Sequence, residues 1–216
     1  MLVLASASPR RRELLTQAGF TFTVHPAHIP EDPLPNEDPV ACVTRLAREK
    51  AQAVIAELSS ISSGAPGPSH LGTGESTNPN LPSTTPLVVL AADTIVTLDN
   101  QILGKPADPA DAARMLRLLS GRTHQVITGV ALISATSTQV AAETTSVTFL
   151  HLTSDEIAAY IATGEPMDKA GAYAIQGRAA RWIPRIEGDY FNVVGLPLAL
   201  VSSLLDSSRT SIAPTN

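Results

Sequence analysis

Hydrophobic positions along the chain fall into short continuous runs, typical of buried strands, and longer stretches with helical spacing. The first run, residues 2–5, is too short for a helix and predicts a strand. Ser8 and Pro9 favour a helix start, with the serine as N-cap and the proline at the first helical position, and Gly19 suits the helix end. This opening predicts an α/β fold.

The remaining pattern continues to favour an α/β domain. The apolar run over residues 87–92 is typical of a buried central strand and continues to residue 96. Thr153 and Glu156 have the spacing of a capping box. The other expected elements are an extended connection over 20–39, a helix over 40–58, a helix over 108–121, strands over 125–133 and 140–150, a helix ending at Gly164, a hairpin of 182–186 with 190–194, and a closing helix over 198–205.

Residues 59–86 differ in composition, because they are mostly Ser, Thr, Pro and Gly. Such a segment cannot bury enough apolar surface to offset the entropy of ordering it, so we expect a disordered surface insertion. Its Gly72-Thr73-Gly74 piece follows no predicted strand and opens no predicted helix, which argues against a phosphate loop. Otherwise we expect a single domain over 1–206 and a flexible tail over 207–216.

The composition, 44% hydrophobic and 16% charged over 216 residues, predicts a globular chain. A net charge of −5 gives no reason to expect polymeric nucleic acid or an anionic membrane as partner, so any basic site must be local. The single cysteine, Cys42, excludes an internal disulfide and favours a reducing compartment. Because the sequence has neither a signal-peptide pattern nor a membrane-spanning run, we expect a cytoplasmic protein with no membrane partner.

Three consecutive arginines, residues 10–12, stand at the start of the first predicted helix, where the helix dipole favours anions instead. An anionic ligand would reconcile these charges. Phosphate oxygens would accept hydrogen bonds from the hydroxyls of Ser6 and Ser8 and from backbone N–H groups. Arginine side chains would each donate two parallel hydrogen bonds to the phosphate. A solvated basic turn is the alternative.

Asp93 lies inside the apolar run of the central strand, where an unpaired carboxylate is costly. It should therefore coordinate a metal, pair with a base, or lie in a cleft at a strand end. Lys50 and Lys105 are isolated lysines; each is either a surface charge or part of a site. Lys105 lacks the glycine spacing of a Walker A phosphate loop.

Residues 168–177 combine small residues with Tyr173 and Gln176. Small side chains allow a close approach of the backbone to a planar ligand. A tight irregular loop packed against the core is the alternative.

Six motifs together resemble the Maf family, also called septum-formation inhibitors, and they occur in the family's order. They are residues 4–11, 46–51, 92–96, 118–121, 168–177 and 194–198. The resemblance covers residues 2–205 apart from 59–86. It implies a mixed, twisted α/β sheet in two lobes with a central cleft, similar to the inosine triphosphate pyrophosphatases. It also implies a house-cleaning nucleoside triphosphate pyrophosphatase.

The resemblance further implies roles for individual residues. Asp93 matches the proposed catalytic proton acceptor, and Arg10, Thr94 and Gln176 match positions tied to substrate choice. The Tyr-x-Ile-Gln-Gly form of residues 173–177 resembles the branch that hydrolyses dTTP and UTP, and an amide such as Gln176 offers the donor and acceptor that a pyrimidine edge requires. The other implied cleft residues are Ser6, Arg11, Glu31, Lys50 and Lys105.

The implied reaction is hydrolysis between the α and β phosphates, which yields a nucleoside monophosphate and pyrophosphate. We expect Arg10, Arg11, Lys50 and Lys105 to hold the triphosphate. A divalent cation, Mg²⁺ or Mn²⁺, is expected with Asp93 and Glu31 as ligands. The resemblance also suggests a homodimer. Two alternatives stay open: a 7-methyl-GTP or broad non-standard nucleotide pyrophosphatase, and a nucleotide-binding regulator of cell division without significant catalysis.

Overall fold

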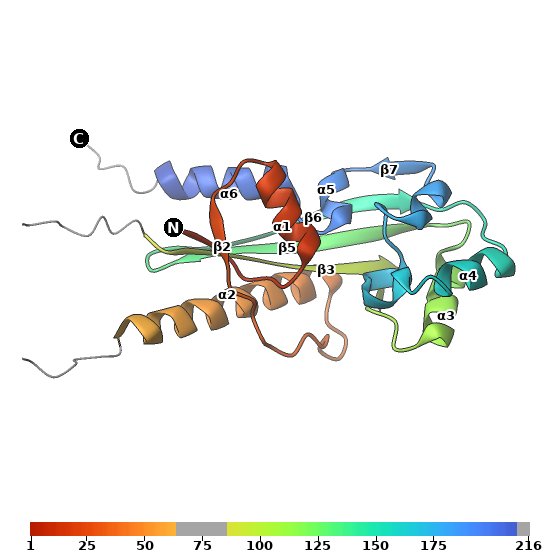
Figure 1. Cartoon of the computed structure of the whole chain (residues 1–216), viewed down its shortest axis with the longest axis horizontal. Helices are drawn as coiled ribbons and strands as arrows, with labels where there is room; N and C mark the ends of the chain where they lie inside the picture. The colour runs from red at the N-terminus through yellow and green to blue at the C-terminus, as the bar shows by residue number, and fades with distance from the viewer. Residues whose placement is uncertain (64–85, 211–216) are drawn as a thin grey trace, which may run out of the picture.

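A computed structural model of the chain describes residues 1–63 and 86–210 (Figure 1). Most of the predicted insertion over 59–86, including Gly72-Thr73-Gly74, lies outside the described residues, as does the end of the predicted tail. Within the described ranges, none of the helices is both long enough and apolar enough to span a bilayer.

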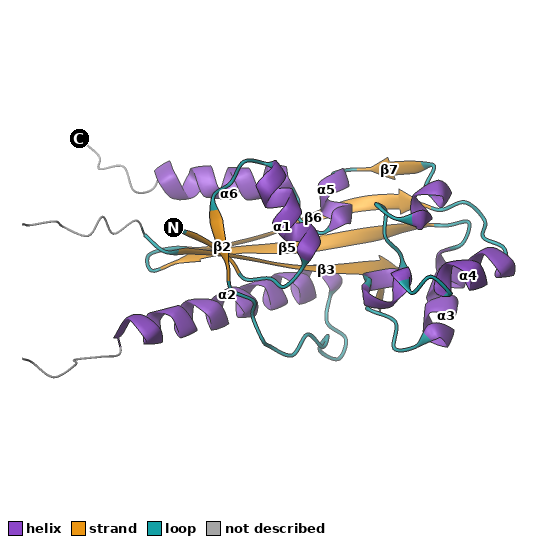
Figure 2. Ribbon diagram, viewed as in Figure 1, coloured by secondary structure: helices purple, strands orange, loops and turns teal. Residues whose placement is uncertain are grey.

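Strands and helices alternate from β1 to β3, whereas later parts of the chain place strands or helices next to one another in sequence (Figure 2). The strands are β1 (Leu2–Leu4), β2 (Phe22–Val24), β3 (Val88–Leu98), β4 (Gln101–Leu103), β5 (Thr123–Ser134), β6 (Thr138–Thr148) and β7 (Arg185–Glu187). The α-helices are α1 (Pro9–Gln17), α2 (Pro39–Ser63), α3 (Pro109–Leu119), α4 (Ser154–Ile161), α5 (Tyr190–Val194) and α6 (Leu198–Thr210). Short 3₁₀ helices cover Glu165–Asp168, Ala170–Ala172 and Arg178–Trp182.

The strands form one mixed sheet, as predicted, in the order β2-β1-β3-β5-β6-β7. β1 runs parallel to both of its neighbours, β2 and β3, whereas the pairs β3–β5, β5–β6 and β6–β7 are antiparallel. β4 pairs with the last residues of β3 through the turn at Asp99 and Asn100, both of which have positive φ angles. The tight turns that join β3 to β4 and β5 to β6 allow only antiparallel pairing of these strands.

Helices cover both faces of the sheet at the end where β1 lies: α2 on one face, α1 and α6 on the other (Figure 2). Because strand side chains alternate, Leu4 and Leu90 pack in the core on the α1 and α6 side, while Val3 and Val89 pack in a separate core with α2. Strands buried on both faces explain why residues 87–92 form a continuous apolar run.

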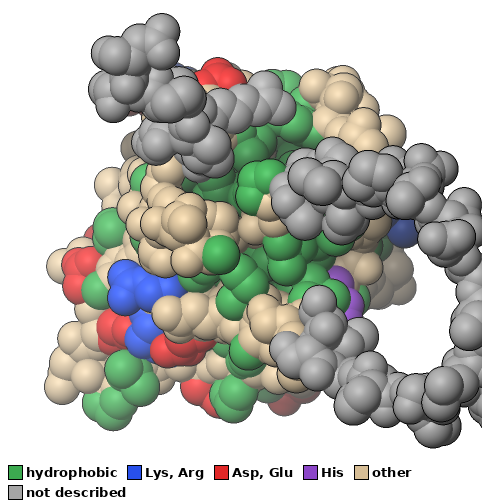
Figure 3. Space-filling view, turned by 90° about the vertical axis from the view of Figure 1, so that its left-hand side faces the viewer, with side chains coloured by type: hydrophobic (Ala, Val, Ile, Leu, Met, Phe, Trp, Pro, Cys, Tyr) green, Lys and Arg blue, Asp and Glu red, His purple; other side chains and the backbone are tan. Residues whose placement is uncertain are grey.

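A second lobe is built where β3, β5 and β6 extend beyond these helices (Figure 1). There α3, α4 and the 3₁₀ helices pack around a core that includes Met115, Phe149, Tyr160 and Trp182. At the opposite end of the molecule, described Lys and Arg side chains lie beside Asp and Glu (Figure 3). The long strands therefore connect two cores, in agreement with the two lobes implied by the resemblance.

Helix α2 approaches the sheet closely at Gly129 of β5. A Cβ atom at this position would lie 2.3 Å from the carbonyl oxygen of Val43, so only glycine allows the helix to lie so near. Lys50 follows Val43 by two helical turns, and the approach therefore determines how deeply its side chain reaches along the sheet.

Most predicted elements are confirmed, but the hairpin predicted over 182–194 is wrong in its second half. Residues 190–194 form helix α5, because Asp189 caps its N-terminus by accepting a hydrogen bond from Phe191 N at 2.7 Å. The first half contains β7, which pairs with β6 instead. Two short strands, β2 and β4, were not predicted, and α2 runs five residues past its predicted end at residue 58.

Candidate active site

Strand β3 presents Asp93 and Thr94 to opposite faces of the sheet, because successive side chains of a strand alternate. Asp93 faces α2, where its Oδ1 atom lies 2.6 Å from Lys50 Nζ. Thr94 faces the α1 side, where its hydroxyl oxygen accepts a hydrogen bond from Arg11 Nη2 at 2.9 Å. One dipeptide thus connects the basic residues of two helices that pack on opposite faces.

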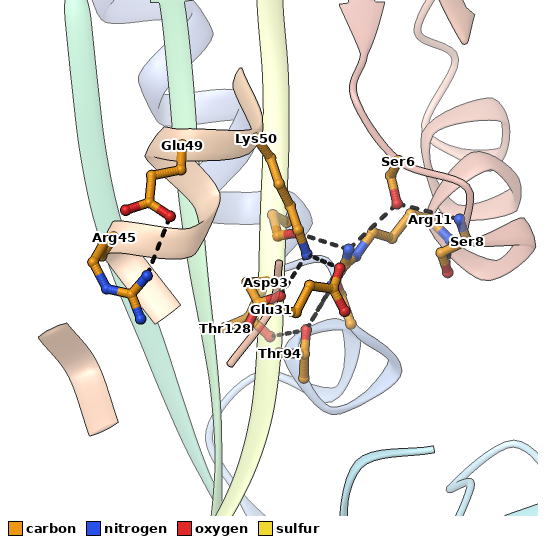
Figure 4. Close-up of polar contacts among 12 residues, drawn as sticks. Ser6, Ser8, Arg11, Glu31, Arg45, Glu49, Lys50, Asp93, Thr94 and Thr128 are labelled. Carbon is orange, nitrogen blue, oxygen red and sulfur yellow. Dashed lines mark hydrogen bonds and ion pairs between the residues drawn. The ribbon is translucent and has the colours of Figure 1, made fainter. Parts of the chain in front are cut away.

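Lys50 lies between two carboxylates (Figure 4). Its Nζ atom is 2.6 Å from Asp93 Oδ1 and also 2.6 Å from Glu31 Oε1. The Lys50 side chain is 7% exposed and that of Asp93 is 10% exposed, whereas Glu31 is 47% exposed. This ion pair explains how the apolar run accommodates a carboxylate: Asp93 pairs with a base, which is one of the three possibilities that the sequence gives.

Glu31 links the buried pair to the surface. It lies in the connection before α2, and its Oε2 atom is 3.4 Å from Nζ of the exposed Lys105. Partial burial alone would raise the pKa of Glu31, but the hydrogen bond from Lys50 and the charges of both lysines outweigh it and lower the pKa below its ordinary value. Glu31 is therefore ionised at neutral pH.

The turn into α1 uses both of its serine hydroxyls internally. Ser8 is the predicted N-cap, and its side chain accepts from Arg11 N at 3.5 Å. Ser6 Oγ accepts from Ser8 N at 3.2 Å and from Arg11 Nη1 at 3.3 Å. Each hydroxyl retains its own hydrogen, so both can still donate to an anion.

Arg11 joins α1 to the rest of the site. Its Nε donates to Gly195 O and its Nη1 to Ala92 O, both at 2.8 Å, in addition to the bonds with Ser6 and Thr94. Withdrawal from water lowers its pKa, while nearby Asp93 and Glu31 oppose that shift. A guanidinium has five N–H groups. These four bonds leave one N–H for the predicted phosphate contact, so Arg11 mainly positions the elements around it.

The charged residues line a cavity of about 650 Å³, a size that suits a small-molecule ligand. Eight of the nine residues predicted for the site line it: Ser6, Arg10, Arg11, Glu31, Lys50, Asp93, Thr94 and Lys105. Apolar side chains complete the wall, among them Val96, Ile102 and Val126. The cavity combines a charged region with a surface against which a planar group can pack.

Gln176 is the predicted residue that the structure does not bring to the cavity. It is exposed, in a turn closed by a hydrogen bond from Gly177 N to Ala174 O at 3.0 Å, and it is not among the residues lining the cavity. Its base contact stays a prediction. Tyr173 of the same motif does line the cavity, and its hydroxyl lies 2.8 Å from Nε2 of the buried His124.

Six lining residues with polar or ionisable side chains lie outside the predicted set: Ser8, Asp32, Cys42, Asp168, Lys169 and Tyr173. Cys42 is buried, as expected of a cysteine that packs as a small hydrophobic residue, and burial raises the pKa of its thiol to about 11. Asp168 and Lys169 open the 168–177 motif that the sequence singles out. The sequence therefore indicates the segment, but not which of its side chains reach the cavity.

A divalent cation such as Mg²⁺ requires oxygen ligands, and the site offers the carboxylates of Glu31 and Asp93. Among the described residues, no three His, Cys, Asp or Glu side chains come together as a metal site. Glu31 and Asp93 nevertheless approach the same point, now contacted by Lys50. Mg²⁺ is commonly held by one or two carboxylates together with substrate phosphates and water, so the residues fit a cation whose coordination the substrate completes.

Comparison with known proteins agrees with the geometry. A family model described as Maf-like protein matches residues 1–208. A dTTP/UTP pyrophosphatase of Koribacter versatilis (strain Ellin345) is 51% identical over 204 residues, which cover 94% of this chain and 92% of the relative. A dTTP/UTP pyrophosphatase of Moorella thermoacetica is 51% identical over 206 residues, with 94% and 93% covered. One from Bacillus pumilus (strain SAFR-032) is 44% identical, with 95% of each chain covered.

Proposed function

The chain belongs to the Maf-like family, and on this premise we propose that it is a nucleoside triphosphate pyrophosphatase that hydrolyses dTTP and UTP. Each would be converted into its monophosphate and pyrophosphate. The observation that carries the proposal is the contact of Lys50 with Asp93 and Glu31 in the wall of a nucleotide-sized cavity. Relatives about half identical over nearly their whole length bear the same activity in their names.

Asp93 is the proposed proton acceptor. Lys50 contacts its Oδ1 atom, and this hydrogen bond fixes the carboxylate while Oδ2 remains available to accept from water. In the proposed step the water oxygen bonds to the α phosphorus as one water proton passes to Asp93. The bond from that phosphorus to the α–β bridging oxygen breaks, and pyrophosphate leaves with the bonding electrons.

The basic residues would bind the polyphosphate and stabilise charge that develops on it. Lys50 and Lys105 approach from one side, and Arg10 stands at the start of α1. Because the site is partly withdrawn from water, these charges act more strongly there than in bulk solvent. This local cluster explains how a chain of net charge −5 can bind a polyanion.

A divalent cation, Mg²⁺ or Mn²⁺, is part of the proposal. Glu31 and Asp93 would hold it, and when bound it would neutralise negative charge on the phosphates.

We also propose that the protein works as a homodimer in the cytoplasm. The family resemblance supports the dimer, and the single cysteine supports a reducing compartment. Size-exclusion chromatography coupled to light scattering would test the homodimer, because the mass of one chain is 22.6 kDa.

The function is tested by measuring pyrophosphate release from a panel of nucleotides in the presence of Mg²⁺. The panel contains dTTP, UTP, dCTP, dATP, dGTP and 7-methyl-GTP. We expect dTTP and UTP to give the highest kcat/KM. A preference for a purine nucleotide would contradict the substrate assignment, and release of pyrophosphate from none of them, despite binding, would contradict the catalytic one.

A further inference from the structure

The chain contains three lysines, and all three line the same cavity. They are Lys50, Lys105 and Lys169. The chain contains twelve arginines by comparison. Several arginines away from the cavity pair with acidic side chains; Arg122 contacts Asp99 at 2.7 Å and Arg185 contacts Glu187 at 2.7 Å. Lys50 and Lys105 already belong to the proposed site, which leaves the role of Lys169 to explain.

The backbone around Lys169 is anchored to the elements that carry the site. Gly171 N donates to Gly104 O at 3.0 Å, and Gly104 precedes Lys105. A Cβ atom on Gly171 would lie 2.8–3.0 Å from three atoms of Val96, and its φ angle of +68° favours glycine. The adjacent Ala172 is also held at a positive φ, 59°. The loop is therefore held against β3 and the Lys105 loop at the cost of local strain.

The current contact of Lys169 does not account for its position. Its side chain is 14% exposed, and its ammonium pairs with the neighbouring Asp168, whose side chain is 75% exposed. An ion pair with an exposed carboxylate contributes little to stability, while burying a lysine side chain costs conformational entropy. A largely buried lysine side chain whose ion-pair partner is solvent-exposed is suited to exchanging that partner for a ligand.

Electrostatics place a further basic residue near the same point. Burial lowers the pKa of Arg10, and the charge of Asp168 is the first opposing effect. Burial alone would raise the pKa of Asp168, but Lys169 and, with a smaller effect, Arg10 help to lower it below its ordinary value. Arg10 of α1 and Lys169 of the 168–172 loop thus lie close to the same carboxylate.

We propose that Lys169 is a substrate-binding residue whose ammonium leaves Asp168 and contacts the pyrophosphate half of the bound nucleoside triphosphate. The inference rests on the proposed function and adds one residue to its site. The scissile α phosphate must lie near Asp93, whereas Gly171, two residues after Lys169, packs against Val96. Val96 is three residues beyond Asp93 along β3, or about 10 Å. The β and γ phosphates carry most of the negative charge, and Lys105 and Lys169 lie on adjoining loops there.

The test uses Lys169→Met and a matched control, Arg178→Met, which removes an exposed positive charge outside the cavity. Turnover of dTTP by the unmodified protein is measured first, since its absence would contradict the proposed function instead of this inference. Inhibition constants for inorganic pyrophosphate and for dTMP are then measured for each protein. Thermal melting establishes that the variants are folded.

We expect Lys169→Met to raise KM for dTTP and Ki for pyrophosphate about tenfold, with a smaller change in kcat and in Ki for dTMP. Arg178→Met should change neither KM for dTTP nor Ki for pyrophosphate by more than about twofold. An unchanged Ki for pyrophosphate in folded Lys169→Met would overturn the proposal. Asp168→Asn gives a second test that leaves Lys169 in place: removing the competing carboxylate should lower Ki for pyrophosphate, and an unchanged or higher value would contradict the exchange of partners.

Discussion

Lys50 Nζ and Asp93 Oδ1 lie 2.6 Å apart, although 43 positions separate the two residues in the chain. Both side chains are nearly buried, and Glu31 is the second carboxylate in contact with the ammonium. Helix α2 brings Lys50 to this point because Gly129 lets the helix approach β5 closely. The charge balance of the site therefore depends on helix–sheet packing as much as on the charged residues themselves.

Lys50→Met should remove activity and also destabilise the protein. It leaves the buried Asp93 carboxylate without its partner, which costs about 3–5 kcal/mol of unfolding free energy. Urea denaturation measures the loss. In the matched double variant, Lys50→Met with Asp93→Asn, the uncompensated charge is gone, so we expect much of the stability to return while activity stays absent. Equal stability of the single and double variants would argue against the pair.

Arg11→Lys should destabilise the fold, although the charge is conserved. A lysine cannot donate simultaneously to Gly195 O, Ala92 O and Thr94 Oγ1 as the planar guanidinium does. We expect a loss of about 2–4 kcal/mol in unfolding free energy. Arg12→Lys is the control, since Arg12 is the exposed neighbour in the same run of arginines. Similar losses in both variants would show that Arg11 does not join the elements as described.

The buried His124 should make stability depend on pH. Burial lowers its pKa from 6.5 to about 4, so between these values the unfolded chain binds a proton that the folded protein does not. The free energy of unfolding should therefore fall as the pH is lowered, with His124 contributing about 2 kcal/mol between pH 7 and 5. His124→Gln keeps a polar group near Tyr173 but cannot titrate. Urea midpoints should depend less on pH in the variant, and equal dependence would refute this assignment.

Gln176→Ala tests the base contact implied by the family resemblance. A lost pair of hydrogen bonds to the pyrimidine edge costs about 1–3 kcal/mol, so the preference for dTTP and UTP should flatten by about tenfold to a hundredfold in kcat/KM. Because Gln176 is exposed and outside the lining of the cavity, this result would require its turn to approach the bound nucleotide. If the variant kept its full preference for dTTP and UTP, the prediction would be wrong, and residues that line the cavity would have to select the base.

Several parts of the fold could be predicted because their signals are local. The N-cap at Ser8, the capping box at Thr153 and the apolar run of β3 each act within a few residues. The segment 190–194 was not predicted, because its β-branched and aromatic residues favour a strand, while the cap at Asp189 and tertiary contacts together favour a helix. There the buried Asn192 side chain donates to Val126 O and Thr145 Oγ1, both at 2.9 Å, which no local pattern indicates.

The site divides in the same way. A carboxylate in a buried strand requires a partner, so the special status of Asp93 followed from the sequence alone. The identity of that partner came from packing between α2 and β3. Lys169 carried no pattern of its own, because its position depends on the contacts of Gly171 with Gly104 and Val96.

The most direct test of the central claim is the hydrolysis of dTTP in ¹⁸O-labelled water, with products analysed by mass spectrometry. Attack on the α phosphorus, assisted by Asp93, places the label in dTMP and leaves pyrophosphate unlabelled. Asp93→Asn should remain folded and form labelled dTMP at least about a hundredfold more slowly. Label in the pyrophosphate, or near-native turnover by Asp93→Asn, would contradict the account.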